Sequence, residues 1–103
     1  MITFSQGDII KINGLGNKLF LVISKNAFIK ATNIFHVCPM LNDVPEGPLH
    51  IKVVGEKSTS GTVICEQIKL IDPSSRRCNR LDSLHYGDVM NISDAIQGIF
   101  EYD

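Results

Sequence analysis

The sequence predicts a mainly β fold, either a small barrel or a strongly curved antiparallel sheet, followed by one C-terminal α-helix. Short apolar runs follow one another at near-regular spacing and are separated by turn residues, which is typical of small antiparallel barrels. Near the C-terminus the spacing of apolar residues changes from the strand period to the helix period. The chain has 103 residues, and this length predicts a single domain over residues 1–103.

The strands are predicted from apolar runs and from the turn residues between them. They are expected at residues 9–12, 19–24, 34–38, 49–53, 62–71 and 80–84. The step Asn13-Gly14 marks a tight turn between the first two strands. Pro39 is expected to end the third strand, because proline removes a donor from the hydrogen-bond ladder. Residues 25–32 form a connection with room for a short helical turn.

The C-terminal helix is predicted from apolar residues at helical spacing, which would form one face toward the core. Asp88 near its start would interact favourably with the helix dipole. The residues of the apolar face are Val89, Ile92, Ala95, Ile96 and Ile99.

Composition indicates an ordinary folded domain rather than a nucleic-acid-binding protein with a strong global charge. Hydrophobic residues make up 44% and charged residues 20%, with a formal net charge of -1. No signal peptide and no apolar run of membrane-spanning length is present, so we expect no membrane association. Three cysteines, an odd number without a CxxC pair, fit a reducing cytoplasm.

Histidine and cysteine positions predict no metal site and no cofactor. The histidines are scattered, and none stands at the close spacing that zinc ligands usually show. Cys38 and Cys65 fall in apolar strand patterns and are interpreted as small core residues. The histidines are His36, His50 and His85.

Residues 61–72, GTVICEQIKLID, form the most informative segment. It resembles the G-x-V-L-x-(E/D)-Q-(V/I)-(R/K)-x-(I/L)-D segment of the MazF/PemK toxins, which are grouped with the Kid and CcdB-like proteins. Residues 7–10 (GDII), 18–24 (KLFLVIS) and 37–41 (VCPML) are similar to three further segments of that family, in the same order. The resemblance therefore covers nearly the whole chain.

This resemblance implies an SH3-like antiparallel β-barrel that forms a homodimer. It implies a toxin of a bacterial type II toxin–antitoxin system, with an antitoxin protein as partner. It also implies a metal-independent endoribonuclease acting on single-stranded RNA, in which the 2′-hydroxyl is the nucleophile. Such chemistry needs a group that accepts the 2′-proton and a cation that stabilises the phosphorane.

The catalytic positions depart from the family pattern. The family's arginine on the second strand corresponds to Lys18, and its threonine or serine on the third strand corresponds to Leu41. Lysine keeps the charge but loses the planar fork that binds two phosphate oxygens at once, and leucine has no hydroxyl. With Lys18 holding the phosphate, His36 is the titratable candidate for proton transfer near neutral pH.

The resemblance also indicates which side chains would contact RNA. They are polar or basic residues near the implied groove: Asn17, Asn42, Gln67, Lys69 and Arg77. For Gln67 a second interpretation is a structural hydrogen bond at the barrel edge or dimer interface, because a buried polar side chain in a strand needs a partner.

Two other functions stay open at this point. The missing arginine and hydroxyl favour a catalytically inactive barrel that binds a protein or RNA without cutting it. A toxin on the same fold that acts on a protein target such as gyrase is a third possibility, because fold does not fix function.

Overall fold

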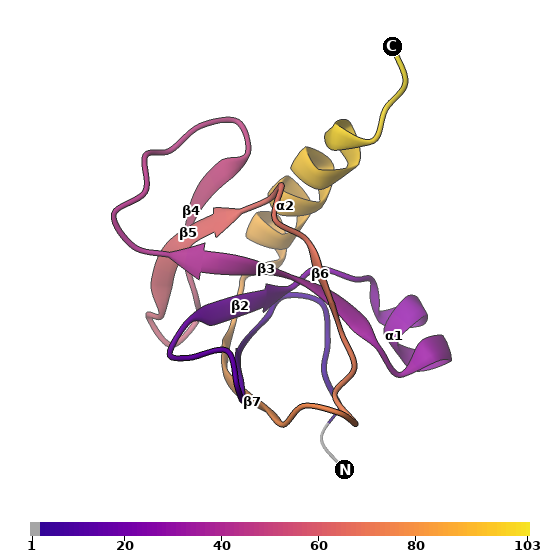
Figure 1. Cartoon of the computed structure of the whole chain (residues 1–103). Helices are drawn as coiled ribbons and strands as arrows, with labels where there is room; N and C mark the ends of the chain where they lie inside the picture. The colour runs from indigo at the N-terminus through magenta and orange to yellow at the C-terminus, as the bar shows by residue number, and fades with distance from the viewer. Residues whose placement is uncertain (1–2) are drawn as a thin grey trace.

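The computed structural model describes residues 3–103 as a seven-stranded antiparallel sheet with two helices (Figure 1). Strand β3 crosses the centre of the molecule, α1 lies beside one end of it, and α2 leads away to the C-terminus. In chain order the elements are β1 (Asp8–Ile12), β2 (Leu19–Val22), α1 (Asn26–Thr32), β3 (Phe35–Leu41), β4 (His50–Val54), β5 (Ser60–Ile64), β6 (Lys69–Ile71), β7 (Cys78–Ser83) and α2 (Tyr86–Ile99).

The strand order is β4-β5-β3-β2-β1-β7, and β6 pairs with β3. All pairs are antiparallel, and β3 is the central strand because it pairs with three others, β2, β5 and β6. The mainly β fold class with a C-terminal helix is therefore confirmed. The sheet is strongly curved but not closed, since within residues 3–103 the end strands β4 and β7 do not pair with each other.

The prediction of one continuous strand over residues 62–71 is wrong. The segment forms two strands, β5 and β6, with a turn between them in which the Gln67 N–H donates to the carbonyl of Ile64 at 3.1 Å. Met40 pairs with Val63, whereas Val37 pairs with Lys69. A single strand cannot keep both registers, so the additional residues form the turn that carries Glu66 and Gln67.

Pro39 does not end the third strand, contrary to the sequence-based expectation, because β3 continues to Leu41. The His36 carbonyl accepts from the Ile23 N–H on the β2 side. Because backbone groups alternate along a strand, the nitrogen of Pro39 points to the opposite side, into the gap between β6 and β5. No ladder donor is needed there, so proline is tolerated.

Two apolar clusters lie on opposite faces of the curved sheet. The first is enclosed by β1, β2, β3, β6 and β7 and includes Phe20, Val37 and Ile71. The second is covered by α2 and includes Leu21, Cys38 and Ile92. Residues Phe20 and Leu21 are neighbours in β2 and enter different clusters, as strand alternation requires.

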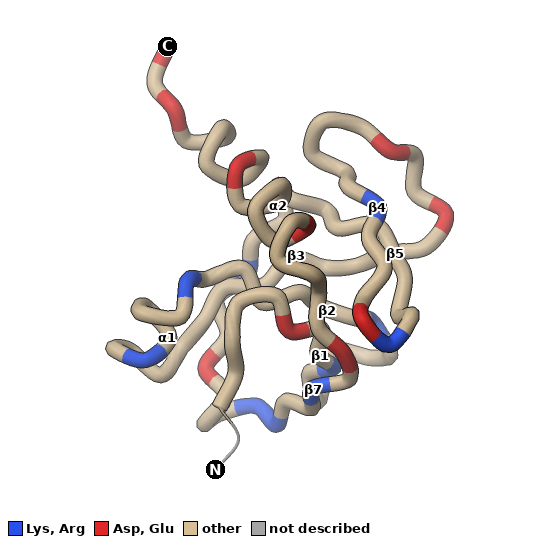
Figure 2. Tube along the Cα trace, turned by 180° about the vertical axis from the view of Figure 1, so that it is seen from behind, with Lys and Arg blue, Asp and Glu red and all other residues tan. Residues whose placement is uncertain are grey.

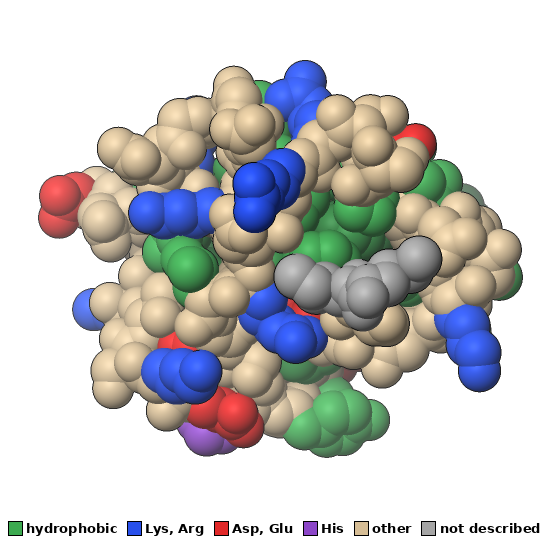
Figure 3. All heavy atoms as spheres, turned by 90° about the horizontal axis from the view of Figure 1, so that it is seen from below, with side chains coloured by type: hydrophobic (Ala, Val, Ile, Leu, Met, Phe, Trp, Pro, Cys, Tyr) green, Lys and Arg blue, Asp and Glu red, His purple; other side chains and the backbone are tan. Residues whose placement is uncertain are grey.

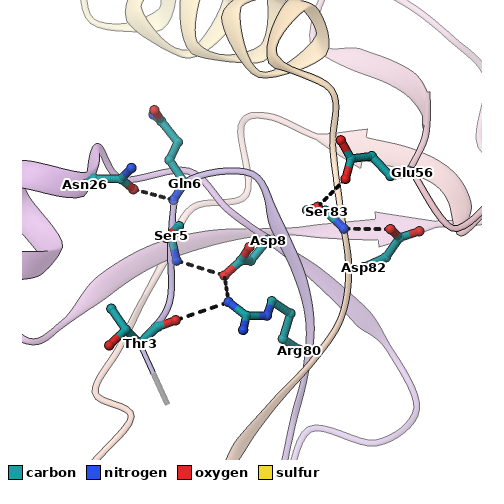
Figure 4. Close-up of polar contacts among 9 residues, drawn as sticks. All are labelled: Thr3, Ser5, Gln6, Asp8, Asn26, Glu56, Arg80, Asp82 and Ser83. Atoms are coloured by element: carbon teal, nitrogen blue, oxygen red, sulfur yellow. Dashed lines mark hydrogen bonds and ion pairs between the residues drawn. The ribbon is translucent and has the colours of Figure 1, made fainter. Parts of the chain in front are cut away.

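Two buried carboxylates anchor loops to the sheet (Figure 4). Asp8 accepts from the Ser5 N–H at 2.8 Å and is 3.3 Å from the Arg80 guanidinium, which also donates to the carbonyl of Thr3. Asp82, only 4% exposed, accepts from the backbone N–H groups of Lys57, Thr59 and Ser83. These carboxylates hold the N-terminal segment and the β4–β5 turn against β7.

None of the helices within residues 3–103 is both long and apolar enough to cross a bilayer.

Candidate functional site

A shallow cleft of about 230 Å³ opens between the turn that precedes β2 and the segment that begins β6. Its apolar lining comes from Leu15, Phe20, Pro39 and Ile68. Its polar lining comes from Lys18, Gln67 and Lys69. Phe20 and Pro39 are opposite each other in the β2–β3 pairing, so their side chains form one continuous apolar floor.

The two lysines of the cleft are exposed and make no ion pair with any acidic residue of the described chain. Glu66 and Asp72 each lie three residues from Lys69 in sequence. The Glu66 carboxylate is bound to His50 Nε2 at 2.9 Å, and the Asp72 carboxylate accepts from the Ser74 hydroxyl at 2.7 Å. The cleft therefore offers two uncompensated positive charges beside an apolar floor. This combination suits a ligand with both a negative charge and a flat apolar part, such as a nucleotide.

Strand register relates Lys18 to further side chains. Leu19 pairs with Met40, so continuing the register by one residue places Lys18 opposite Leu41. Leu41 pairs with Thr62, and Thr62 pairs with Lys52. Residues opposite one another share a sheet face; Lys18, Leu41, Thr62 and Lys52 therefore form a row across β2, β3, β5 and β4 on the face that holds the cleft.

This row contains two residues that the sequence did not single out. Thr62 is buried and lies directly beside Leu41. It therefore places a hydroxyl next to Leu41, whose own side chain has no hydroxyl. Lys52 adds an exposed cation at the far end of the row. Only strand register shows that Lys52 lies beside Thr62.

His36 lies on the other face of the sheet. Along β3 it shares a face with Cys38, which belongs to the cluster under α2, whereas Pro39 of the cleft faces the opposite way. His36 Nδ1 is 2.9 Å from the Ser24 hydroxyl, and its ring lies 5.4 Å from that of Phe28. The structure therefore does not bring His36 to Lys18.

The other predicted RNA-binding residues lie around the cleft rather than in it. Asn17 precedes Lys18 on the same turn and is exposed. Asn42 directly follows Leu41 at the end of β3, also exposed. Arg77 lies on the loop before β7, where its carbonyl accepts from the Asn13 N–H at 2.8 Å.

Gln67 is exposed at the cleft rather than buried in a strand, so a buried structural hydrogen bond is not its role within the described chain. The adjacent Glu66 forms the pair with His50. The hydrogen bond to Glu66 raises the pKa of His50 above its usual value, and the same bond lowers the pKa of Glu66. This pair joins the turn between β5 and β6 to the start of β4.

Cysteine chemistry is disfavoured at the site. Desolvation by burial raises the pKa of Cys38 to about 12 and that of Cys65 to about 11, so both thiols stay protonated near neutral pH. Across residues 3–103, no three His, Cys, Asp or Glu side chains lie together in a way that could hold a metal ion.

Comparison with known families gives a decisive result. The model of the PemK-like, MazF-like toxins of type II toxin–antitoxin systems matches residues 5–100. The chain belongs to this family. Lys18 and Leu41, where the sequence analysis expects departures from the family pattern, are two positions that strand register makes neighbours.

Solved structures support the same fold. A MazF from a MazE–MazF crystal structure of Deinococcus radiodurans has a TM-score of 0.83 at 19% identity, covering 96% of this chain and 97% of its own. An endoribonuclease from a Mycobacterial species, in complex with its cognate antitoxin, has a TM-score of 0.79 at 16% identity, covering 97% and 99%. No curated protein matches the chain.

Proposed function

We propose that this protein is a toxin of a type II toxin–antitoxin system that acts in the cytoplasm as a metal-independent endoribonuclease on single-stranded RNA. The cleft is the observation that carries the proposal. It combines an apolar floor with two lysines that form no ion pair within residues 3–103, in a chain that belongs to a toxin family. The Mycobacterial structural neighbour, which shares this fold, is an endoribonuclease.

In the proposed mechanism the RNA supplies its own nucleophile, the 2′-hydroxyl next to the scissile phosphate. Lys18 contacts that phosphate and stabilises the negative charge that develops on it, and Lys69 contacts a neighbouring phosphate. The floor of Phe20 and Pro39 accommodates a base, and Gln67 provides a donor and an acceptor for its edge. The 2′-oxygen forms its bond to phosphorus as its proton passes to solvent water, and the bond from phosphorus to the 5′-oxygen breaks as that oxygen takes a proton from the Lys18 ammonium. Thr62, in the same row, brings a hydroxyl that can donate a hydrogen bond to a phosphate oxygen.

Two further residues would position the chain of the substrate. Asn17 and Asn42 are amides at the two ends of this region, and neither can act as an acid or base. His36 has no part in this mechanism, because it faces the other side of the sheet and hydrogen-bonds Ser24.

The proposed partners are a second copy of the chain and an antitoxin. Three of the structural neighbours come from MazE–MazF crystal structures, and the Mycobacterial endoribonuclease is in complex with its cognate antitoxin. These complexes support an antitoxin for this chain. Exposed apolar side chains are available for contact between copies. They are Val54, Leu70, Leu81, Tyr86, Met90, Ile99, Phe100 and Tyr102.

The test is incubation of the purified protein with a long unstructured RNA in the presence of EDTA, beside a Lys18→Ala variant. Discrete fragments that disappear with Lys18→Ala support the proposed nuclease and the role of Lys18. Fragments that persist with the variant point to a contaminating nuclease. A Lys18→Arg variant should retain or increase cleavage, because arginine keeps the charge and adds the bidentate fork.

A catalytically inactive binding module is the second candidate. The hydrophobic Leu41 beside Lys18 favours it, since no hydroxyl is present at that position. RNA that is bound in a salt-dependent manner but stays intact at high protein concentration would select this function.

A further inference from the structure

The loop of residues 72–77 lies beside the cleft, on the other side of the turn formed by residues 13–17. Leu15 of this turn lines the cleft. The preceding Gly14 lies next to the Arg76 guanidinium, since a Cβ on Gly14 would be 3.5 Å from Arg76 Nη1. Asn13 is bonded to the backbone of Arg77. A polynucleotide leaving the cleft over this turn would meet the two arginines next.

The backbone of both arginines is held firmly. The Arg76 N–H donates to the Asp72 carbonyl at 3.2 Å, and the Arg76 carbonyl accepts from the Cys78 thiol at 3.4 Å. The Arg77 carbonyl accepts from the Asn13 N–H. The carboxylate of Asp72 caps the loop from within, because it accepts from the Ser74 N–H and hydroxyl.

The side chains of the two arginines, by contrast, are uncommitted. Both are exposed, and in the part of the chain that the structure describes neither guanidinium takes part in an ion pair or hydrogen bond. Arg80, in β7, shows the alternative, because its guanidinium is bound to Asp8 and to the Thr3 carbonyl. Within the described residues, the loop therefore holds the backbone of Arg76 and Arg77 in place and leaves their guanidinium groups available to a ligand. The guanidinium of Arg80, by contrast, stabilises the fold.

Charge along the chain is also separated, although the net charge is only -1. None of the ten Lys and Arg residues lies beyond Arg80, so α2 and the residues after it carry acidic groups alone. Figure 2 shows this separation, with the tail and α2 marked only in red among charged residues. Figure 3, seen from below, shows basic side chains distributed over the opposite end, with apolar atoms and some carboxylates between them.

We propose that Arg76 and Arg77 form a second phosphate-binding surface, which holds single-stranded RNA outside the cleft without reading its bases. The identity of the ligand rests on the proposed function. A planar guanidinium binds two phosphate oxygens at once and so suits a nucleic-acid backbone. The substrate is then a polynucleotide that extends from the cleft across the turn of residues 13–17 onto this loop, and a short oligonucleotide fills the cleft alone.

The test measures binding separately from cleavage. Fluorescence anisotropy with 2′-O-methyl RNA, which lacks the nucleophile, would be recorded over a salt series for oligomers of about two and about twenty nucleotides. The double variant Arg76→Gln/Arg77→Gln should weaken binding of the long oligomer on the order of tenfold. Loss of two phosphate contacts should also reduce the slope of log K against log salt by about 1.4. Binding of the short oligomer should not change.

Two controls separate this effect from loss of charge or loss of folding. Lys25→Gln/Lys30→Gln removes two exposed cations from α1 and its N-cap position, and it should leave both oligomers unaffected. Arg76→Lys/Arg77→Lys should keep the salt slope. A normal melting temperature would show that each variant is folded.

Four results would overturn the inference. An unchanged slope with Arg76→Gln/Arg77→Gln, while the parent cleaves RNA, would overturn the inference and leave the proposed function intact. An equal loss of affinity for the short and the long oligomer with Arg76→Gln/Arg77→Gln would also overturn it. So would an equal loss of affinity for the long oligomer with Lys25→Gln/Lys30→Gln. A parent protein that binds neither oligomer and cleaves no RNA would overturn both proposals.

Discussion

Charged side chains have different roles at the cleft and at the β7 anchor, the pair of buried carboxylates Asp8 and Asp82 that hold neighbouring segments against β7. At the anchor, Asp8 and Asp82 are buried and each is bound by several donors. At the cleft, Lys18 and Lys69 are exposed and unpaired among residues 3–103. The difference teaches that charge satisfied within the chain stabilises the fold, whereas charge left unsatisfied at an apolar cleft is available to a ligand. Substitutions should therefore separate stability from activity.

The largest expected effect is on activity. Lys18→Ala should lower the rate of RNA cleavage about 100-fold or more, the range seen when one group that stabilises a developing oxyanion is removed. Because Lys18 is exposed and unpaired, the melting temperature should stay within about 2 °C of the parent's. Single-turnover cleavage and thermal melting of the same preparation measure the two quantities. A large fall in melting temperature would show that Lys18 belongs to the fold instead.

The anchor should give the reverse result. Asp82→Asn should lower the free energy of unfolding by about 2 kcal/mol, because a buried charge-assisted cluster of hydrogen bonds is weakened. Cleavage per folded molecule should stay nearly unchanged. Chemical denaturation measures the stability. Asp94→Asn, an exposed acid on α2, is the matched control and should have almost no effect.

The same carboxylate predicts an acid-dependent loss of stability. Burial alone would raise the pKa of Asp82, but the N–H groups of Lys57, Ser83 and Thr59 lower it overall, from 3.8 to about 2. The folded state therefore binds this proton less readily than the unfolded chain. The resulting stabilisation is complete above about pH 4 and is lost as the pH falls toward 2. Denaturation curves between pH 5 and 2 should show a fall in the free energy of unfolding of the parent. The fall should be smaller for Asp82→Asn.

A smaller effect is expected at the cleft turn. Gln67→Ala should weaken RNA binding about fivefold, the equivalent of one ordinary hydrogen bond near 1 kcal/mol. The change should appear mainly in KM, with little effect on stability because the side chain is exposed. Steady-state cleavage of a fixed RNA sequence would measure it. A lower stability with unchanged KM would show that Gln67 stabilises the turn between β5 and β6 and does not contact RNA.

The smallest effect concerns the exposed His50–Glu66 pair, which joins the turn between β5 and β6 to the start of β4. The hydrogen bond to Glu66 holds the pKa of His50 above 6.5, so the pair stabilises the fold below that pH and the contribution disappears as the pH rises through the raised value. NMR titration of the histidine ring should show this pKa, and Glu66→Gln should lower it. An identical titration in both proteins would contradict the pairing.

Local patterns in the sequence were sufficient for much of the fold. Apolar runs located the strands, and the change of period located α2. The break between β5 and β6 was not predicted, because residues 61–72 are apolar enough for one strand and the break is imposed by the two registers on β3. The effect of Pro39 also depends on strand pairing. Its missing N–H would end β3 only if a neighbouring strand accepted a hydrogen bond there, and Pro39 lies at the gap between β6 and β5.

The site was predicted in part. The sequence indicated Lys18, Gln67 and Lys69, and the structure places all three at one cleft, while their roles stay predictions. His36 was chosen for its chemistry, and only strand alternation shows that it faces away. Thr62 became a candidate only once β5 was paired with β3, because its neighbour Leu41 is distant in sequence.

Mass spectrometry of the RNA ends left after incubation with EDTA tests the central claim most directly. If the unpaired cations of the cleft act on a substrate that supplies its own 2′-hydroxyl, the upstream fragments must end in a 2′,3′-cyclic phosphate or its hydrolysis product, and the downstream fragments must begin with a 5′-hydroxyl. These ends should be absent when Lys18→Ala is used. Fragments with 5′-phosphate ends, or RNA left intact by the parent protein, would contradict the account.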